Sequence, residues 1–516
     1  MRKASLVAVL GARALVKLRN ARRPWSVALV LLLVAYLRWL SPSVSPYAGG
    51  SDSSGYLWSA RLFRQGTLSV PIDVPPKFPV EAVGAQAFIP LGGTVRPGTM
   101  TLVPTYPTGL PLHLAAAHLL LDDEAGVKGV LLLAAAGALV LLYLLGRDAG
   151  LPRLWAAGGS AILACSPLFL LIAVQPFSDV LATLWAEAAV LSAWRARRRP
   201  ALGWLAGASL GIATLVRPTN LILILPVLAA LGPGLGPYTR LIGGGLPFAV
   251  FVLAYQAWAY GNPFRSGYGD VRLAFSWSAV PLSFRHYLMW CPQLASWIVV
   301  FLPAAAWAWR GPLARWRLVA AAWAIATLGT YAFYALTSET WWYMRFVLPG
   351  FPILIVAGLA GLHAIAQAAS RRVTSPRAVP AIGAAAFALV LLSVAGLIAN
   401  PLFDAHRSVK AGERIYRDAL TMIAIGEDSP QPMLMMQMSG AANYYRPGMR
   451  YLRYDLLSPQ AWLAIREWQR RQRLAIGAAL FDFERNRSLG PGGLALPCDW
   501  QPRGHYLTVT FWQCPP

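Results

Sequence analysis

Long apolar segments, separated by short polar turns, occupy most of residues 1–400. A helix that crosses the hydrocarbon core of a membrane needs about 20 apolar residues, with a range of about 17 to 25. Eleven segments match or approach this length; they cover residues 24–40, 126–146, 154–174, 178–194, 201–216, 219–231, 241–260, 288–309, 318–336, 347–366 and 378–400. The pattern predicts a polytopic α-helical membrane protein with about eleven spans.

The segment 107–121, PTGLPLHLAAAHLLL, is apolar but short for a span. Counting it as a span would also invert the orientation of every later loop. We therefore expect a helix that lies at the membrane surface or inserts only in part. Residues 41–125 then form one long outer loop. Its middle is rich in Pro and Gly, which excludes long helices and favours a lid or groove wall.

Positive charge collects on one side of the predicted bundle. If the N terminus is cytoplasmic, the inner segments hold twenty Lys and Arg against one acid, Asp148, and the short outer segments hold five basic residues. Such an excess marks the cytoplasmic side. The first span is expected to stay as an anchor; the alternative is a cleaved signal peptide, although no convincing small-residue cleavage site precedes Asp52.

The composition supports a membrane protein and argues against a nucleic-acid-binding protein. Of the 516 residues, 57% are hydrophobic and 13% are charged, which is typical of a membrane protein. The net charge of +24 could suggest nucleic acid, but much of it lies in the inner loops that set topology. We therefore expect membrane lipid and no nucleic acid as partners.

Residues 401–516 alternate between helical and strand patterns. Helices are expected at 409–423, near Ala441 and at 459–473, and strands at 433–438, 451–454, 476–483 and 506–512. This alternation predicts a small α/β domain on the outer face, separate from a membrane domain of residues 1–400. Cys498 and Cys514 both lie in it. In an oxidising compartment they are able to pair, which would contribute on the order of 3 kcal/mol.

The stretch 49–70, GGSDSSGYLWSARLFRQGTLSV, follows the first span and carries a lone acid, Asp52. We expect a short amphipathic helix, capped within 51–54. Its apolar stripe (Leu57, Trp58, Ala60, Leu62 and Phe63) should lie on the bilayer, with Arg61 and Arg64 facing water. An acid held at the membrane face is suited to act as a catalytic base. The plainer alternative is that Asp52 only caps the helix.

Further charged residues are expected at the same outer face. Asp179, in QPFSD, begins a descending helix, where the helix dipole alone would favour an acid. Arg217, in RPTN, and Arg265 lie in later outer turns. Arg345, in YMRFVLPGFP, stands where the positive-inside bias disfavours it, and its planar guanidinium suits a pair of phosphate oxygens. Glu187 lies inside a span, where a carboxyl is costly, and has no evident partner.

Several of these motifs together resemble the bacterial GT-C-fold glycosyltransferases of the protein O-mannosyltransferase and aminoarabinose transferase superfamily. They are SDSSGYLWSARLFRQG after the first span, TYPTGLP at the end of the outer loop, QPFSD, RPTN and YMRFVLPGFP. The later MLMMQMSGAANYYRPGMRYLRYD is similar to the small periplasmic domain that some of these enzymes carry. The resemblance spans most of the chain in the same order. It implies a GT-C-like fold of about 11 spans and transfer of a sugar from a polyprenyl-phosphate carrier at the periplasmic face of the inner (plasma) membrane.

The resemblance also implies roles for individual residues. Asp52 stands where the family has its first-loop catalytic acid, Asp179 matches the acid at the second outer turn, and Arg345 matches the basic residue before the late Pro-containing helix. Many relatives follow the first acid with a second one, but Ser53 occupies that place here, so the role of a neighbouring carboxylate, including metal binding, stays open. Tyr106 lies where some relatives have a Lys that meets the lipid phosphate.

The chemistry is consistent with these residues. Hydrolysis of a glycoside usually needs two carboxylates, one of which protonates a poor leaving group. A phosphate leaves as a stabilised anion, so one base that activates the acceptor hydroxyl is enough, with Arg to bind the phosphate. We expect Asp52 to be that base, and Arg345 with Arg217 or Arg265 to bind phosphate; Asp179, Tyr56 and Tyr106 complete the expected substrate-binding set. Attack opposite the leaving group would invert the anomeric centre.

Two other functions stay open. A lipid-linked glycan transporter (flippase) would also be polytopic, but it should show paired polar groups near the midplane and often internal repeats. A non-catalytic membrane assembly factor would explain the C-terminal domain, but not Asp52 and Arg345 at one face. The sugar and the acceptor, which could be a lipid, a glycan or a protein, are not evident from the sequence.

Overall fold

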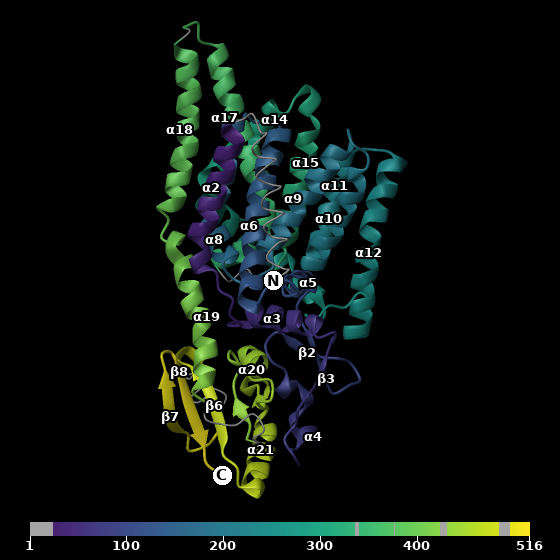
Figure 1. Cartoon of the computed structure of the whole chain (residues 1–516), viewed down its shortest axis with the longest axis vertical. Helices are drawn as coiled ribbons and strands as arrows, with labels where there is room; N and C mark the ends of the chain where they lie inside the picture. Colours follow the sequence, from purple (N-terminus) through teal and green to yellow (C-terminus); the bar gives the residue numbers. More distant parts are fainter. Residues whose placement is uncertain (1–23, 336–339, 376, 424–430, 485–495) are drawn as a thin grey trace, which may run out of the picture.

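The computed structural model describes residues 24–335, 340–375, 377–423, 431–484 and 496–516. Arg22 and Arg23, on which the signal-peptide alternative rests, and residue 336, the end of one predicted span, lie outside this part. Figure 1 shows a tall bundle of helices, with a smaller unit of strands and helices beneath one end of it.

The bundle contains a helix for each of the eleven predicted apolar segments over their described residues. Six helices are unbroken: α2 Pro24–Leu40, α6 Asp123–Asp148, α9 Asp179–Ala196, α10 Leu202–Val216, α12 Leu235–Tyr260 and α18 Ala378–Ile398. The others are composite: α7 Arg153–Ala164 with α8 Pro167–Ala173; η3 Pro218–Leu223 with α11 Ile224–Leu231; α13 Val280–Cys291, η6 Pro292–Ser296, η7 Trp297–Ala304 and α14 Ala305–Ala308; α15 Arg315–Ala324, η9 Ile325–Gly329 and α16 Thr330–Ala332; and η10 Trp341–Gly350 with α17 Phe351–Arg371.

Proline explains several of the breaks. Pro167 and Pro292 each begin a new helical segment, and Pro349 lies near the end of the 3₁₀ helix η10. A proline cannot donate to the preceding turn, so regular α-helix stops there. The pair α7 and α8 is bent by 64°. The bends therefore follow from the sequence.

Six helical stretches among the described residues are long and apolar enough to cross a membrane, and the bent pair α7 and α8 would be a seventh. The remaining apolar helices, such as α10 and the η3–α11 segment, are shorter. The chain is therefore a polytopic α-helical membrane protein, and the number of eleven spans stays a prediction.

The outer loop is built around a helix that lies across the end of the bundle. This helix, α3, runs from Ser51 to Arg64, after the short 3₁₀ turn η1 Ser41–Ser43. Figure 1 shows α3 between the bundle above it and the strand-containing unit below. The loop continues through β1 Val70–Pro71, α4 Val80–Val83, η2 Ala85–Phe88, β2 Gly93–Val95, β3 Thr101–Pro104 and α5 Gly109–Ala117. The strands form a small antiparallel sheet in the order β1-β3-β2.

The expectation that α3 lies on the bilayer is wrong for most of its apolar stripe. Leu57, Trp58, Ala60 and Leu62 are at most 4% exposed because they pack inside the protein. The helix contacts α5 on one side and α20 of the C-terminal unit on another. The hydrophobic stripe is thus explained by protein contacts, which hold α3 in a fixed place.

The C-terminal residues form a mixed sheet with three helices. The sheet order is β5-β4-β6-β8-β7, with β5, β4 and β6 parallel and β6, β8 and β7 antiparallel. The strands are β4 Met433–Leu434, β5 Tyr451–Leu452, β6 Ile476–Phe481, β7 Gln501–Tyr506 and β8 Val509–Cys514, and the helices are α19 His406–Thr421, α20 Ser439–Tyr445 and α21 Pro459–Gln472. Where one strand was expected at 506–512, a hairpin turns at Leu507, whose φ is +51°. Cys498 and Cys514 are joined by a disulfide, as the sequence suggested.

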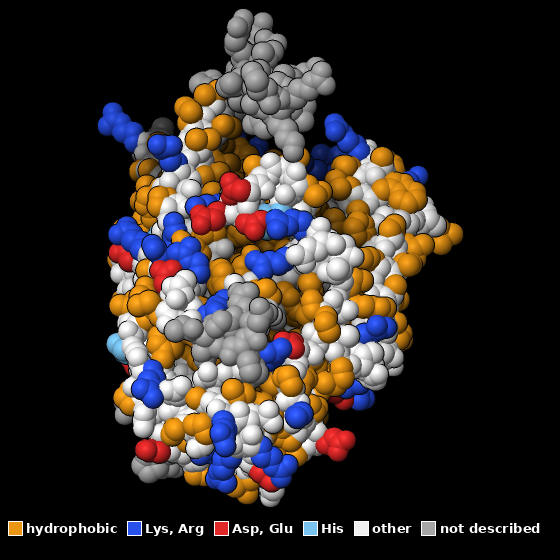
Figure 2. Space-filling model, turned by 60° about the horizontal axis from the view of Figure 1, so that its bottom comes forward, with side chains coloured by type: hydrophobic (Ala, Val, Ile, Leu, Met, Phe, Trp, Pro, Cys, Tyr) orange, Lys and Arg blue, Asp and Glu red, His pale blue; other side chains and the backbone are white. Residues whose placement is uncertain are grey.

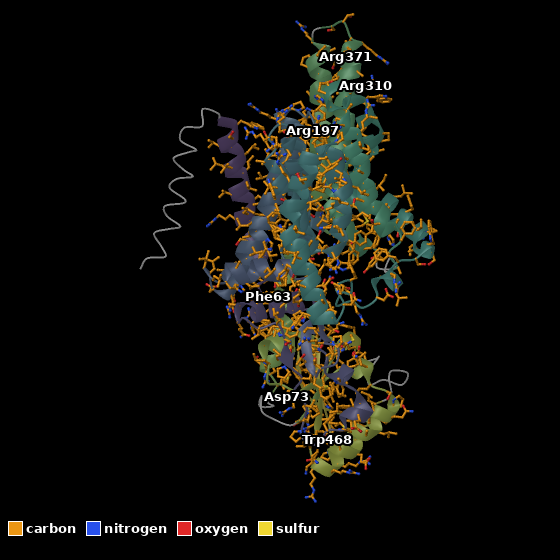
Figure 3. The ribbon with its side chains drawn as sticks, turned by 90° about the vertical axis from the view of Figure 1, so that its right-hand side faces the viewer. Phe63, Asp73, Arg197, Arg310, Arg371 and Trp468 are labelled. Atoms are coloured by element: carbon orange, nitrogen blue, oxygen red, sulfur yellow. A yellow bond between two sulfur atoms is a disulfide. The ribbon has the colours of Figure 1, made fainter. Side chains whose placement is uncertain are left out.

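Three arginines of different predicted inner loops lie at the same end of the bundle. Figure 3 shows Arg197, Arg310 and Arg371 near one end of the bundle, with Asp73 and Trp468 at the other end of the molecule and Phe63 of α3 between them. Figure 2 brings the C-terminal end forward and shows basic and acidic side chains interspersed on that face. These three arginines therefore lie at the end of the bundle opposite α3.

Candidate functional site

Helix α3 places Asp52 in its first turn. The residue at the N-cap position is Gly50, and no side chain caps the helix there. The expected capping by a serine of 51–54 is therefore wrong. The Ser54 hydroxyl instead donates a hydrogen bond to the Gly50 carbonyl, at 2.9 Å. An acid in the first turn is stabilised by the helix dipole. The carboxylate of Asp52, however, does more than complement that dipole, because it has a partner from a distant part of the chain.

That partner is Arg345. Its Nη2 donates to Oδ2 of Asp52 at 2.8 Å, and the two side chains are 14% and 20% exposed. Arg345 lies in η10, and its guanidinium carbon is 5.0–5.2 Å from the ring centroids of Phe177, Trp342 and Phe346. The aromatic rings favour the cation and reduce its contact with water. The two residues that the sequence singled out at this face therefore form one ion pair.

A second ion pair lies beside the first. Arg217, the residue after α10, has Nη2 3.0 Å from Oδ1 of Asp179, the first residue of α9, and this pair is more deeply buried, with side chains 12% and 2% exposed. Arg217 also lies 5.3 Å above the ring of Phe346, the same ring that Arg345 contacts. Phe346 thus connects the two pairs into one cluster.

The tyrosines of the predicted set adjoin this cluster. The Tyr56 hydroxyl donates to the Ser178 hydroxyl at 2.9 Å, next to Asp179, and its ring lies 4.9 Å from that of Tyr106. The Tyr106 hydroxyl shares a 2.6 Å hydrogen bond with Ser51. Burial raises the pKa of both phenols, and the nearby charge of Asp52 raises it further. Both therefore stay neutral hydrogen-bonding groups at ordinary pH.

The cluster retains donors for a ligand. Within the part of the chain that the structure describes, Nε of Arg345 and Nη1 of Arg217 are buried and make no hydrogen bond. A buried N–H without an acceptor is costly. Two arginines with free N–H groups over a shared aromatic ring are suited to bind an anion such as phosphate.

One of the predicted phosphate-binding residues, Arg265, does not join the cluster. Arg265 is exposed in the turn after α12, and its charge acts on Asp270. Its neighbour Tyr268 reaches the cluster instead, with its ring 5.9 Å from that of Tyr106. Glu187 is completely buried in α9, and neither carboxyl oxygen has a hydrogen-bond partner among the described residues.

Sequence reasoning missed the aromatic surroundings of Arg345. Phe177 lies within QPFSD and Trp342 and Phe346 beside Arg345, but aromatic residues at that depth were not distinguished from a membrane-interface belt. Their contact with one guanidinium becomes visible only when α8, α9 and η10 are assembled.

A metal ion at this site would need several ligand side chains close together. The described residues gather no group of three or more His, Cys, Asp or Glu side chains that could hold a metal ion. Asp52 and Asp179 are each engaged by an arginine. These two acids therefore do not form a ligand set for a metal ion.

Comparisons with known proteins bear on the fold. No family model and no curated protein matches the sequence. Two crystal structures of ArnT from Cupriavidus metallidurans are similar to this chain. The structure bound to undecaprenyl phosphate has a TM-score of 0.54 and 14% sequence identity, and the match covers 96% of this chain and 98% of ArnT. The apo structure has a TM-score of 0.53 and 15% identity, and the match covers 95% of this chain and 98% of ArnT. Mycobacterial arabinofuranosyltransferase AftD is also similar over 91% of this chain, at a TM-score of 0.45 and 14% identity, but only 40% of AftD is covered. The likeness to ArnT over both whole chains confirms the predicted GT-C-like fold.

Proposed function

We propose that this chain is a membrane glycosyltransferase that moves a sugar from a polyprenyl-phosphate donor to an acceptor hydroxyl at the periplasmic face of the inner membrane. The observation that carries the proposal is the Asp52–Arg345 pair, which joins a candidate base to a candidate phosphate ligand at 2.8 Å. ArnT, whose fold the chain shares, was crystallised with undecaprenyl phosphate.

Phosphate binding is assigned to the two arginines. The donor phosphate approaches the N–H groups of Arg345 and Arg217 that have no acceptor among the described residues. As the sugar–phosphate bond breaks, negative charge grows on the phosphate oxygens, and donors already in place stabilise that charge without reorganisation. Binding also draws Arg345 away from Asp52, because the phosphate competes for the same guanidinium.

Asp52 then acts on the acceptor. Its carboxylate accepts the proton of the acceptor hydroxyl while the oxygen attacks the anomeric carbon and the phosphate leaves. The leaving phosphate needs no acid, so one carboxylate is sufficient. A single displacement inverts the anomeric centre. The Tyr56 and Tyr106 rings, 4.9 Å apart and buried, pack against each other and support the start of α3 beside the reacting groups.

The prenyl chain is assigned to an apolar cavity of about 550 Å³ beside the cluster, between η3–α11 and η9–α16. Its lining includes Ile222, Leu225, Trp277, Ile325 and Phe333. Tyr331, in the same short helix as the lining residue Thr330, stacks on Phe346 at 5.7 Å, and Phe346 contacts both arginines. A chain in this cavity would have its phosphate end near Arg217.

The orientation of the chain is part of the proposal. Arg197, Arg310 and Arg371, each from a different inner loop, lie at the end of the bundle opposite α3 (Figure 3). The positive-inside rule assigns that end to the cytoplasm. Asp52, the outer loop and the C-terminal unit are then periplasmic, where the Cys498–Cys514 disulfide is stable.

The test is a transfer assay on detergent-purified protein, with a panel of radiolabelled polyprenyl-phosphate sugars and total membrane lipid as acceptor. Wild type should transfer label, and Asp52→Asn should be slower by about 10²- to 10⁴-fold, the usual contribution of a general base. Asp404→Asn removes an exposed carboxylate from a local surface pair and should behave as wild type. An Asp52→Asn protein with the normal rate would show that Asp52 is not the base.

The same assay separates the other functions. A transporter would bind the carrier in both proteins without transferring the sugar, and would move it between leaflets of reconstituted vesicles. An assembly factor would bind no carrier. Either outcome in the wild type, across donors and acceptors, would refute the glycosyltransferase.

A further inference from the structure

A carboxylate of the C-terminal unit contacts the chain just before the Asp52 helix. Oε2 of Glu413, in α19, accepts a hydrogen bond from the backbone N–H of Gly49 at 3.0 Å, across 364 residues of sequence. The absence of a side chain at Gly49 allows this contact, since a Cβ there would lie 2.4 Å from the same oxygen. Glu413 and Gly49 therefore fit each other closely.

Other contacts from α19 and α20 fix the same segment. The Tyr445 hydroxyl accepts from the Ala48 N–H at 2.8 Å, and the Arg417 guanidinium lies 4.6 Å above the ring of Tyr47. At the far end of α3, the guanidinium of Arg61 lies 3.7 Å above the Tyr444 ring and donates to the Tyr444 carbonyl. The expectation that Arg61 faces water is thus wrong, and the C-terminal unit holds both ends of α3.

The same carboxylate is electrostatically coupled to the site. The pKa of Glu413 is raised to about 7, mainly by burial and in addition by the charge of Asp52, while the hydrogen bond from the Gly49 N–H opposes the rise. Tyr416 and Tyr445 are the other titratable groups that interact with it, and both are neutral near pH 7 because their own pKa values are raised. The charge of ionised Glu413 therefore acts at the start of α3, the helix that carries Asp52.

We propose that Glu413 is a positioning residue for the transfer reaction, which holds the start of α3, and with it Asp52, in place through its contact with Gly49. This inference rests on the proposed function. The C-terminal unit thereby contributes to the site without touching the substrate.

The sign of the pH effect follows from the same contacts. Below about pH 7 Glu413 carries a proton and adds no charge near Asp52. As the pH rises through 7 it ionises, and its hydrogen bond with the Gly49 N–H strengthens, which holds the start of α3 more firmly. The transfer rate should therefore rise with pH across this range.

The experiment measures kcat and donor KM from pH 5.5 to 8.5 for wild type, Glu413→Gln, Glu413→Ala and the control Glu467→Gln, an exposed residue of α21. Glu413→Gln keeps a hydrogen-bond acceptor but cannot ionise, so it should match wild type at pH 6, lack the rise near pH 7 and be about tenfold slower at pH 8. Glu413→Ala should be slower at every pH. Donor KM should stay within twofold, because neither arginine is altered.

Each outcome has a distinct meaning. If wild type transfers sugar and Glu413→Gln keeps both its rate and its pH profile, the positioning role is refuted while the proposed function stands. A wild type that transfers nothing refutes the proposed function and this inference with it. If Glu413→Gln is inactive at all pH values, Gly49→Ala, which displaces the carboxylate without removing it, should also slow transfer; a normal rate in Gly49→Ala would refute the role.

Discussion

The carboxylate of Asp52 and the guanidinium of Arg345 lie 2.8 Å apart, although 293 residues separate them in the sequence. Asp52 comes from a helix outside the bundle and Arg345 from the start of a span. The contact occupies one N–H group of Arg345, and that group stays engaged by Asp52 until another anion competes for it.

Replacing Arg345 should weaken donor binding more than replacing a surface arginine does. A hydrogen bond to a charged group is worth about 1.5–3 kcal/mol, so Arg345→Ala should raise the KM for the polyprenyl-phosphate donor by about 10- to 150-fold. Arg345→Lys should recover only part of this, because Lys lacks the planar fork. Arg272→Ala is the control, since Arg272 is 87% exposed and pairs with Asp270 in its own loop. Steady-state kinetics over a donor series would measure the effect. Equal KM values for Arg345→Ala and Arg272→Ala would contradict phosphate binding by Arg345.

The Asp179–Arg217 pair should matter for stability as well as for binding. Removing one member of a buried pair costs about 3–5 kcal/mol, because the remaining charge is left without a partner. Arg217→Ala should therefore lower the thermal midpoint in detergent, and Asp179→Asn/Arg217→Gln, which leaves no charge, should be less destabilised. Arg64→Ala breaks the exposed pair with Asp123 and should cost at most about 1 kcal/mol. A double variant as unstable as Arg217→Ala would show that the charge on Asp179 is not the cause.

The helical bundle could be predicted because membrane spans depend on local properties. Apolar length identified the helices, and prolines such as Pro167 and Pro292 mark where they break. That Asp52, Asp179 and Arg345 lie at one face followed from counting spans and charges, which gives no distances between residues.

The contacts within the site could not be predicted because they join distant segments. Nothing local distinguishes the apolar stripe of α3 from a membrane-surface helix, and it is buried because the C-terminal unit and α5 cover it. Arg265 and Tyr268 share one loop, but only the tertiary fold decides that the tyrosine reaches Tyr106. The turn at Leu507 was missed because it uses a positive φ without glycine or asparagine.

Reduction of the Cys498–Cys514 disulfide should destabilise the C-terminal unit. The two cysteines are 16 residues apart, and a loop of about this length contributes about 3 kcal/mol. Thermal unfolding of wild type should therefore shift downward in reductant. Cys498→Ser/Cys514→Ser should unfold at the reduced value with or without reductant, although Cys165 and Cys291 remain as free thiols. A reductant response in the double variant would point to another cause.

The place of α3 also depends on a glycine that contacts its backbone. Gly92 has φ +86°, and a Cβ there would lie 2.6 Å from the Gly55 Cα and 3.2 Å from the Ser51 carbonyl oxygen, both in α3. Gly98 has a similar φ of +71°, but a Cβ there would meet nothing within 4 Å.

Alanine at these two positions therefore introduces similar backbone strain, of about 1 kcal/mol, but only Gly92→Ala pushes on the helix that carries Asp52. We expect Gly98→Ala to lower the thermal midpoint slightly and to leave kcat unchanged. Gly92→Ala should lower both, since a displacement of about 1 Å at a reacting group can cost about 10²-fold in rate. The two variants are compared in one detergent by thermal unfolding and by the transfer assay. Equal kcat values would mean that the loop at Gly92 does not position α3, and that the bundle and the C-terminal unit hold it unaided.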